Sequence, residues 1–402
     1  MEQDDIKNLP RVKQIEKTKT VVIARKSETF PVYRVPLKYL YYNEQNDRIS
    51  TEIVRYCTEN NCTLPENQDE YNNIFENLIV KSKEDAIVKT QRSIATRGQD
   101  NPGVTLKDGR IVDGNRRFTC LRRIQKETNQ EQYFETIILD YDYKNDYKCI
   151  KSLELELQMG VDEKVKYDPI DKLFGVYKSI RIEKAFTVEE YAALFDDYSV
   201  SEVNKDLKLA DLMCEYLDFQ GTPGKYYIAK DMDLQGTLFE IPAILEKVKK
   251  KNPDLVDDVK LRIFASIAVG TDSRLNLFMR NIKEVVENGD LTKYLSETEH
   301  AVNETIDELE NHPVQDYNDL SDGIRKRDDL KEELTQAVTS QKKAIDSKKL
   351  KKAPIKNSKE ALTSLNAICK EAILEMEQTD RNELEHLFKM IEDKISELRG
   401  NP

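Results

Sequence analysis

Histidine is scarce in this chain, and its cysteines are scattered. The 402 residues include three histidines and six cysteines, and no two cysteines form a Cys-x-x-Cys pair. The histidines His300, His312 and His386 lie far along the chain from every cysteine except Cys369. A Cys/His zinc site therefore lacks its usual pattern, and catalysis by a histidine-activated nucleophile is disfavoured. We expect the cysteines to be reduced, buried thiols.

Long apolar segments are missing as well. No run approaches the roughly 20 apolar residues that a membrane-spanning helix needs. The opening residues, MEQDDIKNLP, are acidic and have no apolar core, so they do not resemble a secretory signal. These absences predict a cytoplasmic protein with no membrane partner.

Positive charge is not in excess. The formal net charge is -12, and 34% of the residues are charged against 39% hydrophobic. A protein that coats DNA without sequence preference usually presents a net basic face. Any contact with DNA must therefore come from a local patch. The length suits two or three domains.

The stretch GRIVDGNRRFTCLRRI at 109–124 carries the strongest functional signal. It predicts a strand over 110–112 and a helix over 116–127, because apolar residues recur at helical spacing after the arginines. The start of a helix offers unpaired N–H groups and partial positive charge, and arginine binds phosphate with a bidentate fork. A glycine in the turn lets the backbone approach closely. These features favour a phosphate chain, with Asp113 placed to hold magnesium or to orient a hydroxyl. The alternative is an ordinary tight turn whose arginines are solvated or paired with acids.

The rest of the chain predicts an α+β protein in three parts. Residues 20–150 predict a small mixed α/β domain with a hairpin turn at Lys107-Asp108-Gly109. Residues 51–83 are polar, and within them the stretch YCTENNCTLPENQDE (56–70) is typical of a loop. Residues 151–310 predict an all-helical domain. Residues 311–402 predict a charged helical region, with a hinge over 312–329 and a break over 346–360.

Two features of the helical parts suggest interactions. Thr187 and Ser199 predict caps of two successive helices, so that 187–210 has a helix-turn-helix pattern, although two helices packed in an ordinary all-α domain fit equally. Pro242 and Pro253 are expected to mark joins between helices. The apolar residues of 358–399 recur at three- and four-residue steps, which predicts a helical hairpin or a partner-binding surface, including one for self-association.

The order of these parts resembles the ParB/sulfiredoxin superfamily, specifically the ParB-like proteins of plasmids, phages and defence loci. Those proteins combine an N-terminal nucleotide-binding domain with a downstream helix-turn-helix. Between about Val32 and Leu217, four segments match the family's boxes in order: VPLKYLYYNEQNDR, SIATRGQDNPGVTL, VDGNRRFTCLR and LELELQMGVDEKVKYDPIDK. In the third box Asn115 stands where sulfiredoxin has its cysteine, which disfavours a sulfinic acid reductase.

The resemblance implies a nucleoside triphosphate, CTP or ATP, bound with Mg²⁺. Carried over to this chain, the residues that would cradle or line the nucleotide are Arg48, Gly98, Gln99, Gly114, Asn115, Arg116, Arg117 and Gln158. The catalytic residues would be Asp113, Glu154 and Glu156, with Asp113 and Glu156 as the metal ligands. The last box departs from the family pattern, since Leu155 and Glu156 stand where Glu and Asn are expected and Met159 replaces Arg.

The predicted function is a nucleotide-gated, DNA-associated factor with slow NTPase activity. DNA would be contacted by Ser199, Asn204, Lys205 and Lys208 at the start of the second helix of the helix-turn-helix pattern. One alternative is a ParB-fold kinase, ATPase or nuclease that uses Asp113. Another is a protein-interaction scaffold with a vestigial pocket. We also expect a homodimer or a protein partner held through the C-terminal helices.

Overall fold

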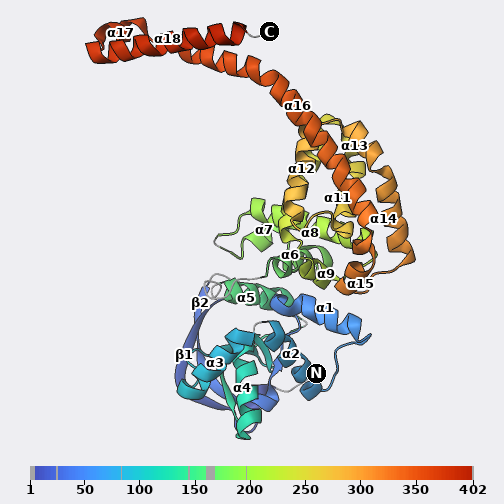
Figure 1. The fold of residues 1–402 in the computed structure, drawn as a ribbon. Coiled ribbons are helices and arrows are strands. Elements are labelled where there is room, and N and C mark those ends of the chain that lie inside the picture. The colour runs from blue at the N-terminus through green and yellow to red at the C-terminus, as the bar shows by residue number, and fades with distance from the viewer. Residues whose placement is uncertain are drawn as a thin grey trace.

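The computed structural model describes residues 5–23, 26–82, 84–143, 145–159, 168–195 and 197–400. All strands in these ranges lie before residue 140 and form one sheet, and the chain that follows is helical (Figure 1). The fold is therefore α+β, as predicted. None of the helices in these ranges has the length and apolar composition that a bilayer crossing requires.

The sheet has six strands in the order β1-β2-β6-β4-β5-β3. The strands are β1 (Lys13–Ile23), β2 (Lys26–Pro36), β3 (Tyr41–Tyr42), β4 (Gly103–Leu106), β5 (Arg110–Asp113) and β6 (Tyr133–Leu139). The β4–β5 hairpin turns where Lys107-Asp108-Gly109 predicted it, whereas β3 and β5 are parallel neighbours. This parallel pair matters for function, because both of its strands end at the same edge of the sheet.

Helices cover both faces of the sheet. Helices α2 (Gln68–Ser82), α3 (Glu84–Arg97) and α4 (Asn115–Thr128) contribute to one apolar core, and α5 (Tyr147–Met159) contributes to the core on the other side of the sheet. The loop predicted over 56–70 is found in shorter form over 60–67, between α1 (Ser50–Glu59) and α2. The polarity of 51–83 hid the buried residues Tyr71, Phe75 and Ile79, which recur at the four-residue steps of a helix.

The region after residue 168 buries a second, larger core made entirely by helices. Its helices are α6 (Pro169–Tyr177), α7 (Val188–Ala192), α8 (Val200–Phe219), α9 (Tyr226–Asp231), α10 (Gln235–Lys251), α11 (Val256–Val269), α12 (Leu275–Asn288), α13 (Leu291–Glu297), α14 (Glu299–Asn311) and α15 (Tyr317–Asp322). Thr187 and Ser199 both cap helices through a capping box, as predicted. Pro242 does not mark a join, because α10 continues through it.

Helix α1 joins the sheet region to the helical region. The Arg55 guanidinium lies 2.6 Å from the Asp231 carboxylate, and the Lys230 ammonium lies 2.9 Å from the Asp171 carboxylate, which also accepts a hydrogen bond from Thr51. These charged contacts fix α1 against α6 and α9, so the edge of the sheet near α1 is held rigidly.

The chain ends in a long helical extension. Helix α16 (Asp328–Asn366) runs out from the helical region and is followed by α17 (Lys370–Glu375) and α18 (Gln378–Gly400) (Figure 1). The predicted break over 346–360 was wrong, because α16 is continuous there and includes Pro354. One proline removes one backbone hydrogen bond, and the surrounding Lys, Leu and Ala residues are strong helix formers. The segment 358–399, expected to be a helical hairpin or a partner-binding surface, is divided among the end of α16, α17 and α18.

Candidate functional site

The candidate site lies at the carboxyl ends of β3 and β5. Because the two strands are parallel neighbours, the segments that follow them meet at one edge of the sheet. Strand β3 leads to the short helix η3 (Asp47–Ile49), and β5 leads through Gly114 to α4. Ligands of open α/β sheets bind outside the carboxyl ends of the strands, so this edge is where a ligand is expected.

Gly114 gives the turn its shape. Its φ of 105° is a conformation that residues with a side chain rarely adopt. A Cβ at this position would lie 2.7 Å from Cζ of Phe134, a fully buried ring. The glycine is therefore required both by the backbone conformation and by the close approach of the core, and it leaves the start of α4 without a side-chain cap.

The guanidinium of Arg116 has no hydrogen-bond or ion-pair partner among the described residues. Each of the other three arginines of α4 has such a partner. Arg117 and Arg122 pair with carboxylates, and Arg123 donates to the side chain of Gln91. Burial lowers the pKa of Arg116 below its ordinary value, and the nearby guanidinium of Arg48 lowers it further. Arg48 of η3 and Arg116 of α4 are both half-buried, and their guanidinium groups lie close enough for their charges to interact.

Asn115 lies beside this pair at the first position of α4. Its Oδ1 atom is buried and accepts no hydrogen bond from any described residue. The backbone N–H groups of the first turn of a helix also have no partner within the helix. The start of α4 therefore combines positive charge, open N–H donors and one unused acceptor, which is a suitable environment for a phosphate that carries a hydroxyl or bound water.

Arg117 and Asp113 are bonded to each other and to neighbouring segments. The Arg117 guanidinium lies 3.0 Å from Oδ2 of Asp113 and donates to the backbone carbonyls of Asn101 and Pro102. The same Asp113 oxygen accepts a bond of 3.1 Å from Lys19, which reaches it from β1. These contacts bind the turn to the loop before β4. A role for Arg117 on phosphate, or for Asp113 as a base or metal ligand, would require this network to open.

Gly98 and Gln99 also have structural contacts. Gly98 ends α3 with a φ of 77°, the usual conformation of a glycine after a helix. The Gln99 side chain accepts from the backbone N–H of Glu135 and donates to its carbonyl, as a neighbouring strand would. The prediction that both residues line a nucleotide stays a prediction.

The predicted catalytic residue Glu154 is part of a buried network. Its carboxylate accepts a bond of 3.1 Å from Asn43 and lies 3.8 Å from the Lys151 ammonium. Lys151 donates over 2.8 Å to Asp47, and each of these three charged side chains is 1% exposed. Burial works to lower the pKa of Lys151, but the Asp47 and Glu154 carboxylates outweigh it and hold the pKa above its ordinary value. The network fixes η3, and with it Arg48, against α5.

The metal assignments have less support than the anion assignments. Within the described ranges, no three His, Cys, Asp or Glu side chains are grouped so as to hold a metal ion. Glu156 is half-buried on α5, and the side chain of Gln158 lies outside the described residues. Asp113 is already bound to two cations. The described residues do not fit a protein-built magnesium site.

The four predicted DNA-contacting residues are exposed on α8. Ser199 caps the helix, and Asn204, Lys205 and Lys208 follow on its outer side. The Lys205 ammonium lies over the Phe239 ring of α10, 5.0 Å from its centre. Contact with DNA through this surface stays a prediction.

Sequence reasoning missed Lys19 and Lys151. Lys19 meets Asp113 across 94 positions of sequence, and no local pattern marks it. Lys151 lies three residues before Glu154, just ahead of the segment that resembles the family's last box, and its spacing of one helical turn from an acid was an available signal.

Comparisons with known proteins found similarity only at the level of solved structures, and one of these structures is described here. No protein-family profile matches the chain, and no curated protein matches it. A solved structure of a Pnob8-like ParB-N domain is similar over 67% of this chain and 100% of its own length, with 14% sequence identity and a TM-score of 0.31. No residue role is taken from a similarity at this level.

Proposed function

We propose that this chain binds a nucleoside triphosphate, CTP or ATP, with the phosphate tail at the start of α4 between Arg48 and Arg116. The observation that carries the proposal is the approach of these two guanidinium groups, together with the absence of any described partner for Arg116. The turn at Gly114 and the unused acceptor of Asn115 support the same placement.

The electrostatics favour an anion over a neutral ligand. Two like charges at the edge of a protein repel each other, and partial burial strengthens the repulsion. A phosphate group that bridges them replaces repulsion by two charge-assisted bonds, and the first N–H groups of α4 add further donors. Arginine suits this role because its fork matches two phosphate oxygens.

The proposal includes a magnesium ion that binds together with the nucleotide and slow hydrolysis of the triphosphate. Mg²⁺ commonly keeps several waters and is held by phosphate oxygens with one or two carboxylates. The ion would therefore arrive with the nucleotide, and Glu156, which is half-buried on α5, is a candidate carboxylate of the predicted set. Hydrolysis is expected to be slow, because Asp113 is engaged by Lys19 and Arg117. A nucleotide-gated role on DNA through α8 remains the broader expectation.

Replacing Arg116 by alanine is expected to weaken triphosphate binding by at least about tenfold, the effect of losing about 1.4 kcal/mol of binding energy. The melting temperature should hold or rise, since a half-buried cation without a partner is removed. Isothermal titration of the full chain with each nucleoside triphosphate and Mg²⁺ measures the affinity.

The matched control is Arg123→Ala, which removes the same charge from the same helix but at a residue bonded to Gln91. It should bind nucleotide like the unmodified chain. Arg117→Ala should mainly lower the melting temperature, because that side chain bonds the turn to the loop before β4. Equal affinity of the Arg116→Ala and Arg123→Ala variants would refute the placement of the phosphates.

A further inference from the structure

The six cysteines differ in exposure, and two of them lie next to each other in space. All six are free thiols; Cys120 is buried, whereas Cys62 and Cys369 are exposed and the other three are half-buried. The expectation of buried thiols was therefore wrong for all but Cys120. Cys57 is half-buried near the end of α1, and Cys62 is in the loop that follows. Their spacing differs from the Cys-x-x-Cys pattern of redox sites, so no sequence motif marks the pair.

Helix α1 ends in a Schellman motif. Asn61, the second residue after the helix, has a φ of 46°, which is the left-handed conformation that this motif requires. Its N–H donates over 3.2 Å to the carbonyl of Thr58, and the N–H of Cys62 donates over 3.1 Å to the carbonyl of Cys57. These are the two backbone bonds that define the motif. The backbone at both cysteines is therefore fixed by hydrogen bonds.

The motif places the side chains of Cys57 and Cys62 against each other. The two positions that it brings together commonly hold apolar residues in contact, and here both hold a thiol. The two thiols are close enough to interact electrostatically: burial raises the pKa of Cys57 above its ordinary value, and the neighbouring Cys62 raises it further. Groups that are held in contact react with each other far faster than groups that meet by diffusion. This pair is thus arranged to react internally.

We propose that Cys57 and Cys62 are a redox modification site that forms a reversible disulfide when the protein meets a peroxide. The thiolate sulfur of Cys62 attacks one peroxide oxygen, the O–O bond breaks, and the products are a sulfenic acid and, after protonation of the released hydroxide, water. The sulfur of Cys57 then displaces the hydroxyl group of the sulfenic acid. The S–S bond forms, and a second water leaves. Two thiols are oxidised, and one peroxide is reduced to two waters.

The exposure of the two thiols sets this order of reaction. Cys62 is open to solvent, whereas Cys57 is half-buried and its raised pKa leaves less of it as the reactive thiolate. Cys62 therefore meets the peroxide, and Cys57 resolves the sulfenic acid. A free thiol in solution reverses the reaction by exchange.

The disulfide would fasten the last turn of α1 to the loop 60–67. The same helix pairs with α9 through Arg55 and Asp231, so its end lies where the sheet region meets the helical region. A closed ring restricts the unfolded chain, and oxidation should therefore raise the melting temperature.

Peptide mapping of the full chain tests the proposal. The chain is reduced, treated with a small excess of hydrogen peroxide, blocked with iodoacetamide and digested with trypsin. Residues 56–81 form one tryptic peptide, which contains Cys57 and Cys62 and no other cysteine. This peptide should be lighter by one H₂ and unblocked, and a thiol reductant should restore both thiols. On a non-reducing gel the chain should keep its mass of 46.7 kDa.

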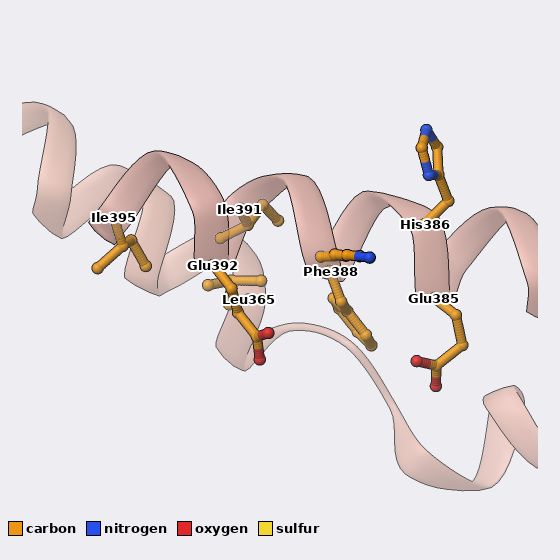
Figure 2. Close-up of a pocket in the computed structure, with 8 residues that line it drawn as sticks. Leu365, Glu385, His386, Phe388, Ile391, Glu392 and Ile395 are labelled. Atoms are coloured by element: carbon orange, nitrogen blue, oxygen red, sulfur yellow. The ribbon is translucent and has the colours of Figure 1, made fainter. Parts of the chain in front are cut away.

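Cys369 is an internal control for exposure without a partner thiol. It follows α16, and neither α16, α17 nor α18 carries another cysteine. Figure 2 shows this part of the chain, with Leu365 of α16 near Ile391 of α18. Cys369 should reach the sulfenic acid or higher acids but should form no disulfide within the chain.

Serine variants test the order of reaction. In Cys57→Ser the exposed Cys62 has lost its resolving thiol, so a sulfenic acid should accumulate there and be trapped by dimedone. In Cys62→Ser the half-buried Cys57 should trap much less dimedone under the same conditions.

Asn61 variants test the role of the Schellman motif. Valine strongly disfavours the left-handed conformation, so Asn61→Val should slow disulfide formation by about tenfold or more. Asn61→Gly is the matched control, because glycine adopts this conformation freely and should keep the rate. Circular dichroism verifies that both variants are folded.

Three results would overturn the proposal. The first is an unmodified chain in which Cys57 and Cys62 are still blocked by iodoacetamide after Cys369 has been oxidised. The second is a disulfide that joins two chains in place of the internal one. The third is an equal rate for Asn61→Val and Asn61→Gly. None of these outcomes depends on nucleotide binding.

Discussion

Replacing Lys151 by methionine is expected to destabilise the protein by about 3–5 kcal/mol, the usual cost of removing one partner from a buried ion pair. The change leaves the carboxylates of Asp47 and Glu154, each 1% exposed, without their cation. It also removes the bond of 2.9 Å to the carbonyl of Gln45. Denaturant unfolding followed by circular dichroism measures the loss.

The control for Lys151 is on the same helix. Lys148 pairs with Glu190 on the surface, with both side chains about half exposed. Lys148→Met should leave the unfolding midpoint almost unchanged, because exposed pairs contribute little. Adding Asp47→Asn and Glu154→Gln to Lys151→Met should restore part of the lost stability. Similar midpoints for Lys151→Met and Lys148→Met would contradict the buried network.

Replacing Gly114 by alanine is expected to cost about 3 kcal/mol or more and to abolish triphosphate binding. The positive φ accounts for roughly 1–2 kcal/mol, and forcing a Cβ against the Phe134 ring adds about 1–3 kcal/mol. The shift of the turn also moves the first N–H groups of α4. Unfolding and titration are measured on the same variant.

Alanine substitutions at two other glycines separate the two causes of the stability loss at Gly114, the backbone conformation and the packing against Phe134. Gly98 has a φ of 77° with open space around it, so Gly98→Ala should show only the backbone cost. Gly103 has no positive φ, but a Cβ there would lie 2.3 Å from Cζ of Phe134, so Gly103→Ala should show only the packing cost. If Gly114→Ala proved no more harmful than Gly98→Ala, the close approach to Phe134 would not constrain the turn.

The sequence predicts the local part of the site well. The strand, the Asp113-Gly114 turn and the helix that follows are found within one residue of their predicted bounds, since turn chemistry and helical spacing are local signals. The roles within the turn are not local. Adjacent arginines point in different directions, and only the fold shows that Arg117 meets Asp113 while Arg116 faces Arg48.

Long-range contacts are what sequence reasoning could not supply. Lys19 of β1 reaches Asp113 across 94 positions of sequence, and Lys151 of α5 reaches Asp47 across 104, so only the fold brings these side chains together. Pro242 and Pro354 show that local sequence signals also misplace helix ends. Each proline locally favours a helix end, yet the surrounding helix formers keep α10 and α16 continuous.

The most direct measurement is a crystal structure of the full chain grown with CTP or ATP and Mg²⁺. The account predicts a triphosphate at the first turn of α4, with its oxygens bound by Arg48, Arg116 and the backbone N–H groups after Gly114. A saturated crystal in which that turn is empty, or in which the nucleotide lies elsewhere, would contradict it.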